Sequence, residues 1–105
     1  MTDLDIVKNI EKELNVKLEK LDKIEWWGRN GYTLNQNGQV TGLVLHSCEI
    51  KNLNRIISLL KELKNLTKLS LGRNELSDIS PLKELMNLME LNLDSNRFSD
   101  IFPLK

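Results

Sequence analysis

The sequence predicts an α/β repeat fold in which short strands alternate with helical or 3₁₀ segments, and three observations lead to this prediction. An apolar pattern recurs after 22 residues, at 66, 69, 71, 76, 79 and 82 and again at 88, 91, 93, 98, 101 and 104. Polar and apolar residues alternate over 68–71, as in a strand with one buried face. Pro81 and Pro103 fix φ and remove a donor, so the segment that returns from each strand should be short or 3₁₀. Because one unit cannot cover its own leucines, the units must stack.

The spacing L-x-x-L-x-L-x-x-N-x-L, which starts at Leu66 and includes Asn74, resembles the leucine-rich repeat. The resemblance implies a solenoid with parallel strands on a concave face and helix or 3₁₀ segments on a convex face. It also implies that the Asn74 side chain bonds backbone groups of its own and the neighbouring turn. Such solenoids usually bind another protein on the concave face.

A less regular unit precedes these two. The residues at 40, 43, 45, 48 and 50 correspond to those at 66, 69, 71, 74 and 76, so the step here is 26 residues, and Cys48 takes the place of the asparagine. The four extra residues fall in 54–63, which lacks proline and has helical spacing of its apolar residues. We expect an α-helix of about two turns there.

The first 39 residues depart from the repeat and are predicted to form an N-terminal cap, with about three repeats over 40–105, the last one incomplete. Thr2 and Asp5 have the spacing of a capping box, which predicts an amphipathic helix over residues 2 to 15. Its apolar stripe is expected to comprise Leu4, Val7, Ile10 and Leu14. Apolar residues at 18, 21 and 24 continue the packing, and both helical and extended conformations fit that stretch.

Asn37-Gly38 is a strong hairpin signal between two apolar-rich segments. With a two-residue turn, Leu34 would face Thr41 and Tyr32 would face Leu43. Tyr32 and Leu34 would then share one face with the leucines of the first repeat. The helix and hairpin together would shield the end of the solenoid from water.

Composition excludes several classes of function. Lys plus Arg and Asp plus Glu both total 15, which gives no basic surface for nucleic acid or membranes. The chain shows no apolar leader and no stretch long enough to span a bilayer. A single cysteine cannot form an internal disulfide. We therefore expect a cytoplasmic protein.

No catalytic, metal or cofactor site is predicted. His46 and Cys48 are the only histidine and cysteine, and two candidate ligands are too few for zinc. A nucleophile would also need an orienting group and an oxyanion pocket, so Cys48 is interpreted as a small buried residue at the asparagine position. Asp78 and Asp100 recur at one repeat position, where turn formation is a better explanation than cation binding.

The outward strand positions predict a concave binding surface for a protein or peptide. Its candidate residues are Val44, His46, Lys68, Ser70, Arg73, Glu90, Asn92 and Asp94. Trp26 and Trp27 form a second candidate contact, because tryptophan is enriched at binding hot spots. The alternatives are a solvated face without a partner and two tryptophans that only cover the leucine core.

The incomplete last repeat suggests an open end. Leu91, Leu93, Phe102 and Leu104 are predicted to form an apolar edge, which either continues into further repeats of a longer protein or binds a second copy of the chain. The D-I-x-P-L segments at 78–82 and 100–104 resemble bacterial internalin-type repeats, although internalins are secreted and no leader is seen here. The cap resembles that of some prokaryotic Roco-type proteins. Two function classes follow: a protein-binding module, or a structural and assembly element.

Overall fold

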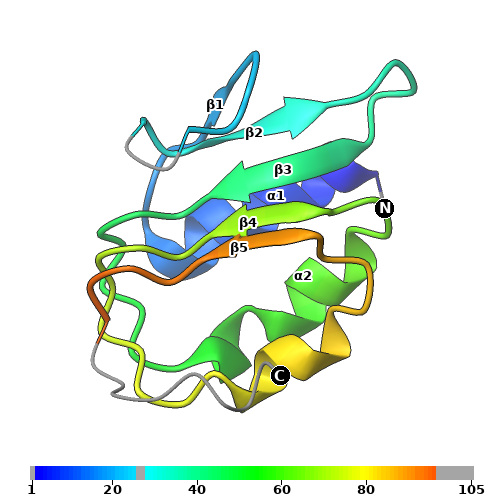
Figure 1. Cartoon of the computed structure of the whole chain (residues 1–105). Helices are drawn as coiled ribbons and strands as arrows, with labels where there is room; N and C mark the ends of the chain where they lie inside the picture. The colour runs from blue at the N-terminus through cyan, green and yellow to red at the C-terminus, as the bar shows by residue number, and fades with distance from the viewer. Residues whose placement is uncertain (1, 26–27, 97–105) are drawn as a thin grey trace.

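The computed structural model describes residues 2–25 and 28–96 of the chain. These residues form one five-stranded sheet in the order β1-β2-β3-β4-β5, with helical segments packed on one face (Figure 1). The strands are β1 (Glu19–Lys20), β2 (Gly31–Leu34), β3 (Val40–Val44), β4 (Lys68–Ser70) and β5 (Glu90–Asn92). The α-helices are α1 (Asp3–Leu14) and α2 (Ile57–Glu62), and the 3₁₀ segments are η1 (Leu53–Arg55) and η2 (Ser80–Glu84). The predicted α/β class is confirmed.

Helix α1 begins as the sequence predicts. The Thr2 hydroxyl accepts the Asp5 N–H at 3.2 Å, and the Asp5 carboxylate accepts the Thr2 N–H at 3.0 Å, which completes the capping box. These bonds lower the pKa of the exposed Asp5 carboxyl, the backbone bond with Thr2 being the largest cause. The predicted apolar stripe needs one correction. Leu4 is 41 % exposed and Ile6 is 2 % exposed, because the buried face runs through Ile6 and Ile10 and leaves the first turn outside the core.

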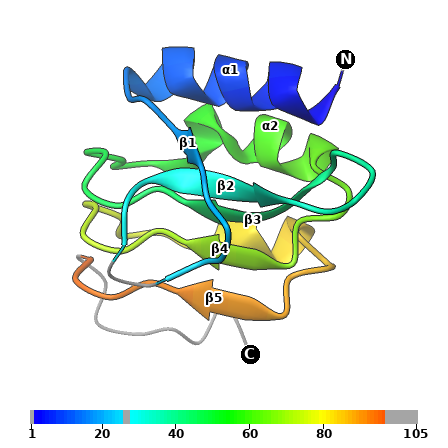
Figure 2. The same ribbon diagram turned by 90° about the horizontal axis from the view of Figure 1, so that it is seen from above.

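The cap helix lies beside α2, at the N-terminal end of the row of helical segments (Figure 2). Two polar contacts join α1 to later elements of the fold, and a third joins it to the segment that follows it in the chain. The Val40 N–H donates to the Asp3 carboxylate at 2.9 Å, the Leu18 N–H donates to the Glu11 carboxylate at 2.7 Å, and Arg55 pairs with Glu13 at 3.1 Å. Ile6, Val7, Ile10 and Leu14 of α1 lie in the same buried cluster as the leucines of the repeats.

The β2–β3 hairpin confirms half of the predicted register. Tyr32 faces Leu43, but Leu34 faces Val40 rather than Thr41, with an irregularity after Thr33. The two-residue turn is wrong: Asn35 pairs with Gln39 across a three-residue loop, and Gly38 has φ +76°. The Asn35 side chain accepts the N–H groups of residues 37 and 39, which favours the longer loop.

The repeats place strands on one face and helical segments on the other, as predicted. Strands β3, β4 and β5 are parallel, with Leu43, Leu69 and Leu91 in register. The segment after β4 is the 3₁₀ helix η2, with Pro81 in its first turn. The α-helix of about two turns expected within 54–63 is present as α2, which begins only at Ile57 because a 3₁₀ turn occupies the first part of that range.

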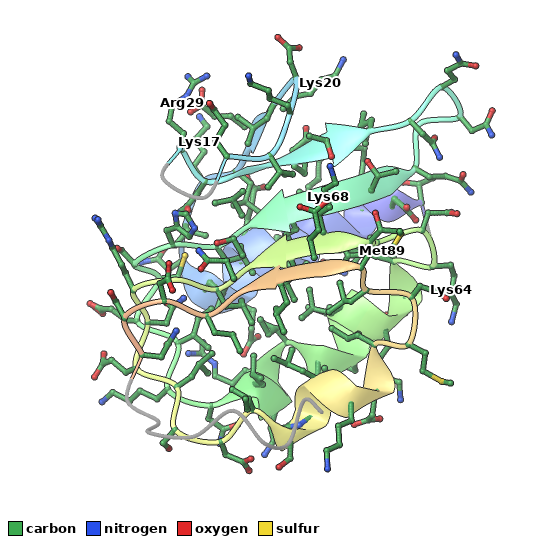
Figure 3. The ribbon with its side chains drawn as sticks, viewed as in Figure 1. Lys17, Lys20, Arg29, Lys64, Lys68 and Met89 are labelled. Atoms are coloured by element: carbon green, nitrogen blue, oxygen red, sulfur yellow. The ribbon has the colours of Figure 1, made fainter. Side chains whose placement is uncertain are left out.

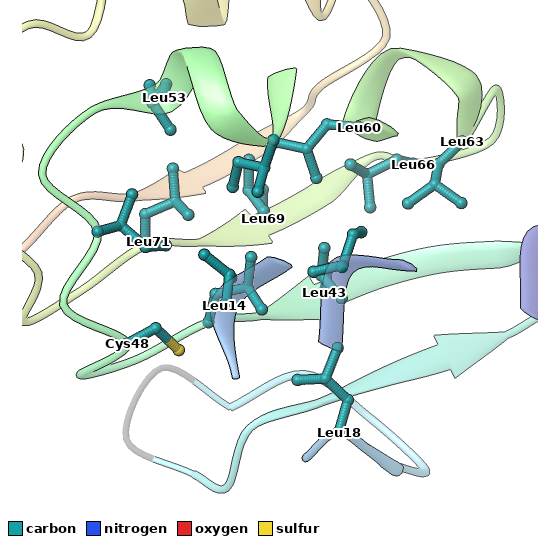
Figure 4. Close-up of a cluster of buried hydrophobic side chains, with 14 of the residues drawn as sticks. Leu14, Leu18, Leu43, Cys48, Leu53, Leu60, Leu63, Leu66, Leu69 and Leu71 are labelled. Carbon is teal, nitrogen blue, oxygen red and sulfur yellow. The ribbon is translucent and has the colours of Figure 1, made fainter. Parts of the chain in front are cut away.

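A single apolar core joins the cap to the repeats. Leu14 and Leu18 from the cap lie in the same cluster as Leu43 of β3 and Leu69 of β4 (Figure 4). Tyr32 and Leu34 pack against this cluster, as the shared-face prediction requires. The boundary between cap and repeats at residues 39 and 40 stays a prediction. Among residues 2–25 and 28–96, none of the helices has the length and apolar character needed to cross a bilayer.

Candidate functional site on the concave face

The strand register aligns residues at the outward strand positions in columns across β3, β4 and β5. Gly42, Lys68 and Glu90 lie opposite one another on β3, β4 and β5. Val44, Ser70 and Asn92 form the next column in the same way. We call the sheet face that bears these columns, away from α2 and η2, the concave face. Figure 3 shows Lys68 on this face of β4.

Two candidate contact residues are not accessible, which corrects the expectation that they lie on a free surface. Val44 and Ser70 are both 0 % exposed. The cap loop, which we define as residues 21–25 and 28–30, packs over β3. A Cβ atom on Gly42 would lie 2.5 Å from the Ile24 side chain, so the loop contacts the strand closely at this point. Sequence periodicity places Val44 outward but carries no information about the loop that covers it.

The other candidate residues remain at least partly accessible. Lys68, Arg73, Glu90 and Asp94 are exposed, and His46 and Asn92 are half-buried. Lys68 of β4 and Glu90 of β5 form an ion pair, in which the Lys68 Nζ lies 3.4 Å from the Glu90 Oε2 and about half of each side chain is exposed. Such an exposed pair stabilises the fold by at most about 1 kcal/mol.

Four of these residues meet in a cleft of about 450 Å³ between the cap loop and the carboxyl ends of the strands. We call it the concave cleft, and its lining consists of Gly28, Asn30, His46, Ser47, Gly72, Arg73, Asn92, Asp94 and Ser95. Its predicted members are His46, Arg73, Asn92 and Asp94. Gly28 and Asn30 are not predictable from the repeat pattern, because they precede the repeats and correspond to no repeat position.

A chain of hydrogen bonds forms the floor of the cleft. The His46 imidazole bonds Ser70 through Nε2, and the Asn92 amide donates to the Ser70 hydroxyl oxygen at 3.0 Å. The Asn92 carbonyl oxygen accepts the Asp94 N–H at 3.2 Å. The buried Ser70 hydroxyl is therefore satisfied from both neighbouring repeats, and it fixes the positions of His46 and Asn92.

The imidazole of His46 favours its neutral form. Burial lowers its pKa from the ordinary value of 6.5, and the nearby positive charge of Arg73 lowers the pKa further. A hydrogen bond with the Gly28 backbone opposes these effects. His46 thus bridges the cap loop and the second repeat as an uncharged group at neutral pH.

One rim of the cleft is formed by residues that share an unusual backbone conformation. Ser47, Arg73 and Ser95 occupy the same position in successive repeats, with φ values of 53°, 57° and 60°. The Ser47 N–H donates to Gly72 O at 3.2 Å, and the Arg73 N–H donates to Asp94 O at 2.8 Å. These bonds hold the left-handed residues in place and stack their side chains along the rim.

Behind the cleft lies the predicted asparagine ladder. The Asn74 carbonyl oxygen accepts the N–H groups of Cys48 at 2.9 Å and Ile50 at 3.2 Å, while its amide donates to Leu45 O at 2.8 Å and Leu71 O at 2.9 Å. Asn96 repeats this role one turn later by accepting the Leu76 N–H at 3.0 Å. The side chain of Asn74 is 5 % exposed, so its bonds satisfy buried backbone groups.

Cys48 occupies the ladder position in the first repeat, as predicted. Its thiol donates to His46 O at 3.3 Å. Burial raises the pKa of this thiol to about 11, and a hydrogen bond from Asn30 opposes the rise. A thiol protonated at neutral pH is a poor nucleophile, which agrees with a structural role.

Of the two aspartates that recur at one repeat position, only Asp78 lies in the described part of the chain. The Asp78 carboxylate accepts the Ser80 N–H at 2.9 Å, and this bond is the main cause of its lowered pKa. Asp78 therefore stabilises a turn before η2, while Asp100 lies outside the described residues. Within the described part of the chain, no three His, Cys, Asp or Glu side chains are grouped to hold a metal ion.

An apolar groove of about 690 Å³ lies at the last described strand. Its apolar lining comprises Leu82, Leu85, Leu88, Met89, Leu91 and Leu93. Leu91 and Leu93 are half-buried, and Met89 is 82 % exposed. The other predicted edge residues, Phe102 and Leu104, lie outside the described residues, as do Trp26 and Trp27.

The stacked strand-and-helix units define an α/β solenoid whose repeats are joined by an asparagine ladder. Residues 64–105 match the family model described as leucine rich repeats in two copies. This match covers the second half of the repeat region, and the architecture of the described residues is that of a leucine-rich repeat solenoid. No curated protein sequence matches it significantly.

Two solved structures are similar to about nine tenths of this chain, and a third is similar to part of it. The leucine-rich repeat ectodomain of the receptor kinase SOBIR1 from Arabidopsis thaliana gives a TM-score of 0.57 at 25 % identity, over 92 % of this chain and 55 % of that chain. Pollen Receptor Kinase 3 gives a TM-score of 0.57 at 22 % identity, over 90 % of this chain and 48 % of that chain. This similarity supports the fold alone. Internalin C2 from Listeria monocytogenes gives a TM-score of 0.45 at 31 % identity, over 62 % of this chain and 37 % of that chain. This chain spans about half the length of the first of these structures.

Proposed function

We propose that this chain is a protein-interaction module that binds a protein or peptide on its concave face, through the concave cleft and the exposed residues of β4 and β5. Leucine-rich repeat domains generally mediate protein–protein interactions. The observation that supports the proposal for this chain is the cleft itself, which gathers four outward-facing polar residues from three repeats. A rigid hydrogen-bonded floor fixes His46 and Asn92, which reduces the entropy lost when a partner binds.

The geometry favours an extended segment of the partner over a broad flat contact. The three parallel strands are short, and the cap loop already covers the outward face of β3. A standard interface needs about 800 Å² from each partner, which the exposed part of β4 and β5 does not provide by itself. A peptide strand or loop that enters the concave cleft uses the available surface more fully.

A photocrosslinking comparison tests this proposal. A benzoylphenylalanine residue is placed either at Glu90 on the concave face or at Lys83 of η2 on the convex side, both of which are exposed. We expect one protein from the native source to crosslink at Glu90 and not at Lys83, and to bind the purified chain in calorimetry. The same partner crosslinked equally from both positions, or only from Lys83, would contradict binding on the concave face.

We also propose that the module has no catalytic activity of its own. Leucine-rich repeats are typically non-enzymatic. The only thiol in the chain is buried with a pKa of about 11, and its carbonyl partner offers no general base. A cytoplasmic location remains a prediction from the sequence.

A second candidate function is assembly through the apolar groove at β5. The observation that favours it is the half-buried Leu91 and Leu93 together with the highly exposed Met89. A second copy of the chain that covers this groove would bury several leucines at about 25 cal/mol for each Å² removed from water. This function predicts that the chain forms a dimer in solution.

A further inference from the structure

Arg73 differs from the other described arginines in its lack of a carboxylate partner. Arg29 pairs with Glu19 at 3.3 Å, and Arg55 pairs with Glu13 at 3.1 Å. Among residues 2–25 and 28–96, the guanidinium of Arg73 forms no ion pair or side-chain hydrogen bond. A guanidinium offers five N–H donors in a planar fork that suits carboxylates, so this group is available to a ligand.

The position of Arg73 directs this charge at the concave cleft. Arg73 lines the cleft, and its charge is close enough to His46 to lower the pKa of the imidazole. Its backbone is fixed by the N–H bond to Asp94 O at 2.8 Å, within a left-handed conformation. Ser47 and Ser95 flank it along the rim and add hydroxyl groups that can donate to the same ligand.

The other charged side chains near the cleft, within the described part of the chain, do not neutralise Arg73. Lys68 and Glu90 neutralise each other in an ion pair of 3.4 Å. Asp94 lines the cleft on the neighbouring column, and its carboxylate has no ion-pair partner among the described residues. Among the residues that the structure describes, the cleft therefore contains one available cation and one available anion. The hydroxyl groups beside Arg73 can donate to an anion that the guanidinium holds at the rim.

We propose that the concave cleft binds a carboxylate of the partner, held by Arg73 with Ser47 and Ser95 beside it. This inference rests on the proposed function, because it specifies the chemistry of the segment that enters the cleft. The carboxylate can belong to an aspartate or glutamate side chain or to a chain terminus, and both sources place the same planar anion against the guanidinium. Asp94 acts against this ligand through like-charge repulsion and so limits its affinity.

Nuclear magnetic resonance titration of the full chain with short peptides tests the proposal. The probes are acetyl-Gly-Glu-Gly-amide, its Gln and Lys counterparts, and acetyl-Gly-Gly-Gly with a free carboxyl terminus. We expect saturable amide shifts at Gly28, Ser47, Gly72 and Ser95 with a carboxylate probe, and none with the Gln or Lys probes. The Glu probe and the free-terminus probe distinguish the two sources of the carboxylate.

Three variants make the assignment specific. Arg73→Gln should weaken binding of the carboxylate probe by at least about tenfold, because it removes the charged bidentate donor. Arg29→Gln removes the same charge outside the cleft lining, near β1 (Figure 3), and should leave binding unchanged. Asp94→Asn should tighten binding several-fold, since it removes the repulsion.

Three results of these titrations would contradict the proposal. Shifts with the Lys probe that disappear in Asp94→Asn would assign the cleft to a cationic ligand. Carboxylate binding unaffected by Arg73→Gln would place it elsewhere on the chain. If no probe shifts the cleft but a partner still crosslinks at Glu90, the carboxylate inference fails while concave-face binding stands.

Discussion

Asn30 and His46 exchange two hydrogen bonds across the junction between the cap and the first repeat. The Asn30 amide donates to His46 O at 2.9 Å, and its carbonyl oxygen accepts the His46 N–H at 2.6 Å. The Cys48 thiol donates to the same carbonyl at 3.3 Å. In the next repeat the corresponding carbonyl of Gly72 accepts the Asn74 amide at 3.2 Å and the Ser47 N–H at 3.2 Å. An asparagine from the cap therefore takes over part of the ladder that Cys48 cannot complete, and it also fixes the wall of the concave cleft.

This relationship predicts that Asn30→Ala lowers the stability of the fold and also makes the His46 backbone in the cleft wall less ordered. Two part-buried backbone groups of His46 would lose a partner, at a cost of about 1–3 kcal/mol in the free energy of unfolding. Urea unfolding measures this loss, and the amide resonance of His46 reports the local change. Asn87→Ala removes one exposed side-chain bond and serves as the control, with an expected loss of about 0.5 kcal/mol or less. Equal losses in both variants would show that Asn30 has no special role.

The neutral state of His46 predicts a loss of stability at acidic pH. Its folded pKa lies below the unfolded value of 6.5, so the unfolded chain binds a proton first as the pH falls. The stabilisation is complete above pH 6.5 and is lost below it, with a slope of at most about 1.4 kcal/mol per pH unit for one proton. The charged groups near the ring are Arg73, which disfavours the imidazolium, and Asp94 in the same cleft.

Denaturant unfolding between pH 5.5 and 7.5 measures this dependence, since His46 is the only histidine. His46→Gln retains hydrogen-bonding groups but does not titrate, and its stability should be flat over the same interval. A slope of the same size in His46→Gln would assign the pH dependence to other groups.

Cys48 predicts a second pH dependence, at the alkaline end. The thiol has a folded pKa of about 11, against an ordinary value of 9.0, because burial disfavours the thiolate. Stability is complete below the unfolded pKa and is lost as the pH rises from 9 towards 11, where only the unfolded chain has released the proton. Unfolding curves over this interval should fall more steeply for the native chain than for Cys48→Ser. Parallel curves would show that the thiol is not buried in solution.

Sequence periodicity predicts the repeat half of this molecule well, because each repeat position has one environment. Leu69 and Leu71 are buried, Asn74 bonds the ladder, and Pro81 begins a 3₁₀ segment, as the pattern requires. The cap is predicted less accurately. The hairpin loop is longer than Asn37-Gly38 indicates, because the Asn35 side chain satisfies the backbone of a three-residue loop.

The candidate site shows where periodicity has no information. The register places Val44 and Ser70 outward, yet both are fully buried. Val44 belongs to the strand that the cap loop covers, and Ser70 is enclosed by His46 and Asn92. Contacts of Asn30 and Gly28 with the repeats join residues of irregular sequence to the strands, so no spacing rule identifies them.

The close packing of the cap predicts a ranking of glycine substitutions. A Cβ atom at Gly31 would lie 2.1 Å from the Glu19 carbonyl oxygen, whereas one at Gly42 would lie 2.5 Å from a carbon of the Ile24 side chain. Backbone yields less than a side chain, so Gly31→Ala should cost about 3 kcal/mol or more and Gly42→Ala about 1–3 kcal/mol. Gly38→Ala is the control: nothing lies within 4 Å, and φ +76° should cost about 1 kcal/mol. Thermal unfolding gives the order, and an equal or reversed order would contradict the close approach of β1 and the cap loop.

The apolar groove at β5 predicts self-association, if assembly is the second function of the chain. Light scattering over a concentration series should then give a mass that rises from 12.2 kDa towards twice that value. Met89→Lys should hold the chain at 12.2 kDa, because it places a charge in the groove at a side chain that is already 82 % exposed. Leu4→Lys changes an exposed leucine of α1 outside the groove lining and should leave the dimer intact. A constant mass of 12.2 kDa at all concentrations would rule out assembly of this chain with itself and leave the concave face as the surface to test.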